Sequence, residues 1–190
     1  MGKIIGITGG IGSGKSVVSR IVRLNGFGVY DCDREAKILM ATDPQLKESL
    51  IRLLGEEAFP GGELDRAYVA SRIFTDKGLL ADVNLLVHRA VRDDFMRKAN
   101  ADRKGRYFCE SAILASSGLM AVCEEVWLVD APREVRVKRV IARNGLPKAD
   151  ILKRMEVQEN EFSSMPQAIR IENDDHHQIL PQILDLLHQH

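Results

Sequence analysis

The chain has 190 residues, and its 27 Lys and Arg balance its 27 Asp and Glu, so the formal net charge is zero at pH 7. This balance excludes a global basic field, and we expect no nucleic-acid partner. No apolar run approaches the roughly 18 residues that cross a membrane, and no secretory leader precedes the first predicted strand, so we expect a cytoplasmic protein with no membrane partner. The cysteines lack metal-type spacing and are expected as reduced thiols, with Cys109 and Cys123 in the core.

Short apolar runs rich in β-branched or aromatic residues alternate with helical patterns along the chain. In chain order, strands are predicted at 3–8, 28–31, 107–110, 126–130 and 168–171. Helices are predicted at 16–25, 34–41, 45–54, 66–74, 77–103, 132–144, 149–160 and 179–188. This alternation predicts an α/β fold with a parallel sheet of about five strands flanked by helices. Residues 43–104 are too many for one crossover, so we expect a helical insert over the ligand edge of the sheet.

Between the first strand and the first helix lies the string Gly9-Gly10-Ile11-Gly12-Ser13-Gly14-Lys15-Ser16, which fits the pattern G-x-x-x-x-G-K-[ST]. Glycines let the backbone turn its N–H groups inward toward phosphate oxygens, and the following helix adds its positive end. The string predicts an ATP-binding phosphate loop in which Lys15 faces the β- and γ-phosphates and the Ser16 hydroxyl ligates Mg²⁺. The alternative is a glycine turn beside a surface lysine, and the flanking strand and helix favour the phosphate loop.

A phosphate loop by itself does not distinguish kinases, GTPases and motor ATPases. The sequence contains no Asn/Thr-Lys-x-Asp motif for reading guanine, and a motor ATPase usually needs a longer chain. Phosphoryl transfer to a small molecule needs an acid on the acceptor side, cations around the transferred group and a lid that excludes water. Two further features of the sequence match these requirements.

Asp31-Cys32-Asp33 ends the second predicted strand, at the edge where parallel sheets bind ligands. We predict Asp33 as the base that accepts the proton of the attacking hydroxyl, with Asp31 in a supporting role. The alternative is that one aspartate caps the helix predicted to begin near Arg34.

A second cluster of candidate residues lies on the predicted helix that begins near Pro132. Arg136, Arg139 and Arg143 recur at i, i+3 and i+7 and share one helix face, and the turn Asn144-Gly145-Leu146-Pro147 follows. We predict that Arg139 and Arg143 close over the ATP phosphates as part of a lid at about 139–160. A solvated basic stripe is the alternative.

Taken together, these motifs closely resemble the dephospho-coenzyme A kinase family. The resemblance lies in residues 5–16, in Asp31-x-Asp33, in Leu85-Leu86-Val87-His88, in Arg139 and Arg143, in Gln158 and in Ile171-Glu172-Asn173, and it runs through nearly the whole chain in the expected order. The chain departs from the family pattern at four places. His88-Arg89 stands where a His-Pro is usual, so the helix could continue there, and Ser116 stands where a glutamate is usual. Glu110 replaces an Asp, and Lys37 replaces an Arg.

The resemblance implies a single P-loop kinase domain over residues 1–190, with the 43–104 insert forming the CoA-side wall. The implied reaction phosphorylates the ribose 3′-hydroxyl of dephospho-CoA with ATP and Mg²⁺, in a protein that is a monomer or a weak homo-oligomer. Lys15, Asp33 and Arg139 are then catalytic, and Asn173 joins the phosphate loop and lid arginines at the nucleotide. The residues implied to bind the acceptor are Thr8, Asp31, Asp33, His88 and Glu110.

Two alternatives stay open from the residues themselves. Another small-molecule kinase, of the nucleoside monophosphate or shikimate type, would share the phosphate loop and the lid. A nucleotide-binding regulator without catalysis would share only the loop. His88 could equally be a structural histidine with satisfied hydrogen bonds.

Overall fold

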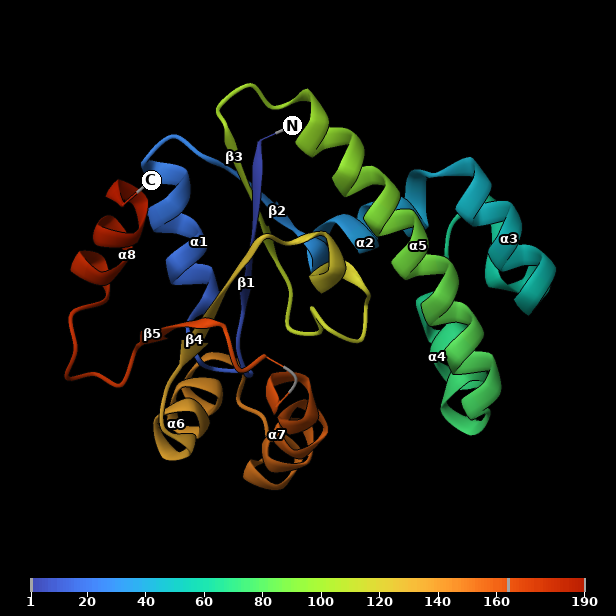
Figure 1. The fold of residues 1–190 in the computed structure, drawn as a ribbon. Helices are drawn as coiled ribbons and strands as arrows, with labels where there is room; N and C mark the ends of the chain where they lie inside the picture. The colour runs from blue at the N-terminus through green and yellow to red at the C-terminus, as the bar shows by residue number, and fades with distance from the viewer. Residues whose placement is uncertain (1, 164, 190) are drawn as a thin grey trace. The chain divides into compact units, whose positions relative to one another are not determined.

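The structure, a computed structural model, describes residues 2–163 and 165–189. The chain forms two compact units, one made of residues 1–31 and 99–190 and the other of residues 32–98. The first unit contains a parallel sheet in the strand order β2-β3-β1-β4-β5 (Figure 1). The strands are β1 (Lys3–Thr8), β2 (Gly28–Asp31), β3 (Arg106–Glu110), β4 (Glu125–Asp130) and β5 (Ile169–Glu172).

Two helices of the first unit bury apolar faces against the sheet. Figure 1 shows α1 and α8 side by side along one face of the sheet, and their residues contact each other. The segment 111–124, with its short 3₁₀ turn η3, lies against the core residues of the other face, since Leu114 is fully buried beside Gly6. The elements are α1 (Lys15–Leu24), η3 (Leu119–Val122), α6 (Arg133–Asn144), α7 (Lys148–Ser163) and α8 (Ile179–His188).

Alternation along the strands decides which side chains face which layer. Ile5 and Ile7 of β1 are fully buried and share one core cluster with Val18 and Val22 of α1. Phe108 and Trp127, from the strands that flank β1, meet in that cluster edge to face at 5.2 Å between ring centroids. Such a ring pair contributes about 0.5–1.5 kcal/mol beyond its burial. The core therefore fixes β1, and with it the loop that leaves its end.

The other face of β1 is shaped by a glycine. A Cβ built on Gly6 would lie 2.6 Å from Leu114 Cδ2 and 3.1 Å from Cys123 Sγ. Cys123 Sγ in turn lies 3.8 Å from Cys109 Sγ, and both residues are free cysteines. The missing side chain therefore leaves room for the segment 111–124 to pack closely on the sheet.

The second unit is helical, and aspartates cap two of its helices. Asp43 Oδ1 accepts from the N–H groups of Gln45 and Leu46 at the start of α3, and Asp65 Oδ1 accepts from Tyr68 N at the start of α4. Each such cap stabilises its helix by about 1 kcal/mol. The elements are α2 (Cys32–Thr42), α3 (Pro44–Leu54), η1 (Glu56–Ala58), η2 (Pro60–Gly62), α4 (Arg66–Thr75) and α5 (Lys77–Ala101).

The α/β class and the five-stranded parallel sheet predicted from the sequence are confirmed. Pro132, predicted in the first turn of its helix, lies one step earlier at the N-cap of α6. The helix α5 passes His88 and Arg89 without a break, as expected once the usual proline is replaced. The compact helical unit 32–98 overlaps the predicted insert 43–104 but also includes α2. Among the described residues, no helix combines the length and the apolar character needed to cross a bilayer.

Candidate active site

The candidate site lies at the carboxyl ends of the parallel strands. The strand β1 is central, with β3 on one side and β4 on the other, so the chain order reverses beside it. Ligands of open parallel sheets bind at such a reversal, outside the carboxyl ends of the strands. The phosphate loop predicted from the sequence leaves β1 at this point and leads directly into α1.

Two glycines let the loop turn closely against its neighbours. Gly9 has φ of 150°, and a Cβ there would lie 2.3 Å from the carbonyl oxygen of Val129. Gly12 has φ of 80°, and a Cβ there would lie 2.6 Å from the carbonyl oxygen of Arg136. Both conformations strain any residue with a side chain, and both Cβ positions collide with backbone. The shape of the loop therefore depends on these glycines.

The loop fits a bound polyphosphate in two independent respects. The helix α1 begins after Gly14, which as a glycine offers no side chain to cap the helix. The buried hydroxyls of Thr8 and Ser13 have no hydrogen-bond partner among the described residues, 2–163 and 165–189. An unpaired buried polar group costs about 1–3 kcal/mol, so phosphate oxygens at this loop would relieve a cost. The uncapped helix end also carries the partial positive charge that anions prefer.

Lys15 is held over the loop by the loop's own carbonyl groups. Its Nζ donates to Gly9 O at 2.8 Å and lies 3.5 Å from Gly10 O. A phosphate oxygen would compete with these neutral acceptors and would form the stronger, charge-assisted bond. Ser16 lies in the first turn of α1 with its side chain exposed, and its role as a magnesium ligand stays a prediction.

Two further residues predicted from the sequence reach the same loop. Asn173 Nδ2 donates to Ser13 O at 2.7 Å, and Arg139 Nη1 lies 3.5 Å from both Gly12 O and Ser13 O. Arg139 Nη2 lies 3.4 Å from Asn173 Oδ1, which links the two side chains. Arg143 lies one turn farther along α6, where it is exposed and donates to Asn144 Oδ1 at 2.7 Å, and its contact with ATP stays a prediction.

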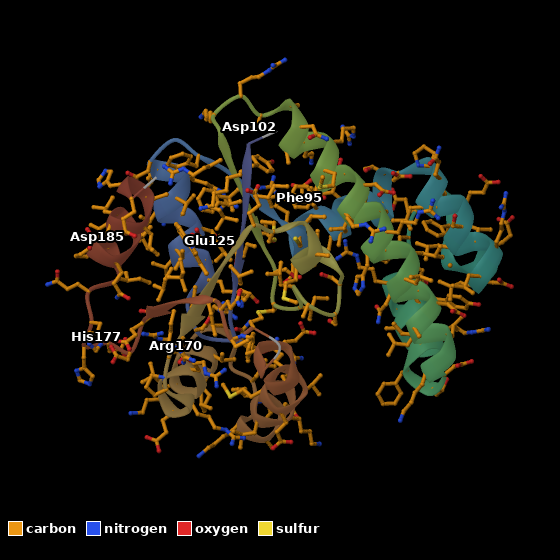
Figure 2. All side chains as sticks on the ribbon, viewed as in Figure 1. Phe95, Asp102, Glu125, Arg170, His177 and Asp185 are labelled. Carbon is orange, nitrogen blue, oxygen red and sulfur yellow. The ribbon has the colours of Figure 1, made fainter. Side chains whose placement is uncertain are left out.

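The backbone that carries Asn173 is fixed by Asp130 at the end of β4. The N–H of Asn173 donates to the carbonyl oxygen of Asp130 at 2.8 Å. The Asp130 carboxylate accepts from Ala131 N at 2.9 Å and forms an ion pair with Arg170 of β5, which is labelled in Figure 2. These contacts explain why a residue from the end of the sheet reaches a loop near the N-terminus.

The structure adds residues that the sequence did not assign to the site. The guanidinium of Arg136 lies directly against Gly10: a Cβ built on Gly10 would lie 2.0 Å from Arg136 Nη1. Asp175 forms an ion pair with Arg139. Gln158 on α7 accepts from the Ile11 N–H at 2.8 Å. The arginine stripe could have indicated Arg136, and the family resemblance pointed to Gln158 without a role, whereas no local pattern indicates Asp175.

An acidic pair lies beside the loop on the other side of β1. Asp31 of β2 and Glu110 of β3 are direct neighbours in the strand register, and both are half-buried. Burial is the main cause that raises the pKa of Glu110 above its usual value. The Ser19 hydroxyl opposes this shift, the Asp31 carboxylate adds to it, and the cations Lys15 and Arg23 oppose it. Carboxylates in this position can hold a divalent cation or orient a hydroxyl.

Asp33 and His88 belong to the helical unit 32–98. Asp33 is exposed in the first turn of α2, which begins at Cys32, so Asp33 lies inside the helix and is not its cap. An acidic residue in a first turn also stabilises the helix by its charge. His88 is half-buried on α5. The catalytic role of Asp33 and the acceptor-binding role of His88 stay predictions.

The raised pKa of Glu110 predicts a pH-dependent stability. The folded state holds the Glu110 proton more tightly than the unfolded state does. The contribution of Glu110 to the free energy of unfolding is therefore present below the ordinary glutamate pKa, about 4.3, and is lost as the pH rises through the raised pKa. Glu110→Gln should remove this part of the decrease, which urea denaturation at about pH 4.5 and about pH 7.5 would measure. Glu63→Gln, at an exposed position, is the control, and identical pH profiles for Glu110→Gln and the wild type would contradict the assignment.

Known proteins resemble this chain over nearly its whole length. The family model for dephospho-CoA kinase matches residues 3–178. A dephospho-CoA kinase of Porphyromonas gingivalis is 39% identical over 185 residues, which cover 96% of this chain and 92% of that protein. A dephospho-CoA kinase of Bacteroides fragilis is 37% identical and covers 96% of this chain and 90% of its own. The crystal structure of TT1252 from Thermus thermophilus aligns with a TM-score of 0.84 at 35% identity, over 98% of this chain and 96% of that one. The chain belongs to the dephospho-CoA kinase family.

Proposed function

We propose that this protein transfers the γ-phosphoryl group of ATP to the 3′-hydroxyl of the ribose of dephospho-CoA. The hydroxyl oxygen attacks the γ-phosphorus, the bond to the β,γ-bridging oxygen breaks, and CoA and ADP leave. The observation that carries the donor side is the convergence of Lys15, Arg139 and Asn173 on the phosphate loop. Family membership carries the acceptor side.

The donor half of the mechanism is electrostatic. Backbone N–H groups from Gly12 to Ser16 and the ammonium of Lys15 bind the phosphates, whereas the Ile11 N–H donates to Gln158. Arg139 stabilises the charge that moves with the γ-phosphoryl group. Arg136, whose guanidinium lies against Gly10, is a third cation at the loop. Preorganised cations of this kind lower the barrier because they do not reorient during the reaction.

Mg²⁺ is the expected companion of ATP, and the donor set fits it. The Ser16 hydroxyl and the carboxylates of Asp31 and Glu110 are oxygen ligands, which this cation prefers, either directly or through water. When bound, Mg²⁺ neutralises phosphate charge. The raised pKa of Glu110 in the free protein would fall when a cation binds beside it, because a positive charge favours the carboxylate.

The acceptor half depends on aspartate chemistry. Asp33 orients the ribose hydroxyl and accepts its proton as the new bond forms. Asp31 and Thr8, at the ends of β2 and β1, are assigned to the same substrate, together with His88 of α5. The proposal also includes the lid at about 139–160, a cytoplasmic location and a monomer or weak homo-oligomer with no nucleic-acid or membrane partner.

A panel of acceptors tests the function directly. With MgATP present, dephospho-CoA should cause ADP release, whereas nucleoside monophosphates and shikimate should not. Lys15→Ala should lower this turnover by roughly a hundredfold or more while the far-ultraviolet circular dichroism stays that of the wild type. Turnover with another acceptor alone would replace the substrate assignment, and ATP binding without turnover on any acceptor would favour a regulator.

Asp33→Asn separates the base from a structural residue. The amide keeps the size of the side chain but cannot accept the proton, so kcat should fall by about 10²–10⁴ while the affinity for ATP changes little. Steady-state kinetics with dephospho-CoA and calorimetric titration with MgATP measure the two quantities separately. If only the affinity for ATP falls, Asp33 serves the metal or the fold instead.

A further inference from the structure

The C-terminal half of α7 contacts two loops that follow different strands. Gln158 Oε1 accepts from the Ile11 N–H of the phosphate loop at 2.8 Å. Three residues later, Glu161 Oε2 accepts from Ala115 N at 3.1 Å and from Ser116 N at 3.2 Å, in the loop that follows β3. Residues three apart lie on the same face of a helix. One face of α7 therefore joins the loop after β1 to the loop after β3.

Of the two loops that α7 contacts, the loop after β3 is held more firmly by the sheet and the core. Ser111 N donates to the carbonyl oxygen of Ile7 at 3.0 Å, which continues the pairing of β3 with β1. Leu114 is fully buried, directly before the two amides that Glu161 binds. A carboxylate that accepts from two successive N–H groups forms charge-assisted bonds, which are stronger than neutral ones. Glu161 therefore ties α7 to a segment that the sheet and core already fix.

The rest of α7 is held by a separate apolar cluster. Ile151 and Met155 of α7 pack with Val137 and Val140 of α6, and all four are buried. This cluster lies in the N-terminal half of α7, so the loss of Glu161 leaves it intact. The end of α7 that carries Gln158 would then lose its support while the fold stays.

We propose that Glu161 is a positioning residue for the phosphate loop. By binding the N–H groups of Ala115 and Ser116, it holds α7 where Gln158 can accept from Ile11, and so keeps the loop in the geometry that phosphoryl transfer requires. A small displacement of the reacting groups costs turnover out of proportion to its size. This role rests on the proposed kinase function only for its catalytic consequence, because the contacts themselves exist without a substrate.

A double-mutant cycle tests whether Glu161 acts through Gln158. Glu161→Ala and Gln158→Ala should each lower kcat roughly tenfold, with less than about twofold change in the KM for ATP. The first variant loses the two charge-assisted bonds to Ala115 and Ser116, and the second loses the contact with Ile11. The double variant should be no slower than the slower single variant, because both remove one linkage. Glu161→Gln keeps one acceptor oxygen and should lie between the wild type and Glu161→Ala. Glu156→Ala, at an exposed position on the same helix, should match the wild type.

Two kinetic results would overturn the proposal. One is a wild-type kcat in Glu161→Ala. The other is a pair of single losses that multiply in the double variant, because independent effects add as free energies.

Hydrogen exchange measured by mass spectrometry on the ligand-free protein keeps this test apart from the kinase assignment. Glu161→Ala should speed exchange in peptides that cover 113–118 and 9–13, and leave peptides of α1 and α8 unchanged, whereas Glu156→Ala should change none of them. Unchanged exchange at 9–13 would refute the coupling even in an active kinase. An inactive wild type that shows the expected exchange pattern would refute the kinase function and leave the coupling in place.

Discussion

A polyphosphate tail is bound by N–H groups that turn toward one point, and the backbone can make this turn only where side chains are absent. In this protein the turn follows the buried central strand β1, and the carbonyl oxygens of Val129 and Arg136 lie where Cβ atoms of Gly9 and Gly12 would be. The core therefore fixes the start of the loop, and α1 and α6 fix its end. Every other feature of the site is placed relative to this loop.

Three segments distant in sequence from the loop bind its backbone groups. Asn173, after β5, and Arg139, on α6, contact the carbonyl oxygens of Ser13 and Gly12. Gln158 on α7 binds the N–H of Ile11. Asn173 and Arg139 thus bind carbonyl groups of the loop and Gln158 binds one N–H group, so neighbouring elements stabilise the loop from outside. The acidic pair Asp31 and Glu110 lies on the opposite side of β1, where a metal or an acceptor hydroxyl can use it.

Local patterns were enough to predict the sheet, the phosphate loop and the neighbourhood of Arg139. Strands and helices follow from periodicity, and G-x-x-x-x-G-K-[ST] has a fixed local geometry. The same patterns could not tell which turn of α6 contacts the loop: Arg139 does so, and the role of Arg143 stays a prediction. The contacts of Gln158 and Glu161 span 147 and at least 45 residues of sequence, so no local signal predicts them. Long-range partners of this kind are decided by tertiary packing, which the sequence of a single chain does not reveal.

Calorimetric titration with MgATP tests the central role of the loop most directly when it compares two glycine variants. Gly12 and Gly26 have φ of 80° and 89°, so an alanine strains the backbone at either position, but only Gly12 belongs to the loop, and a Cβ on Gly26 meets nothing within 4 Å. The account predicts that the wild type and Gly26→Ala bind MgATP alike and that Gly12→Ala binds at least about tenfold more weakly. Equal affinities for all three proteins, or no binding by the wild type, would contradict it.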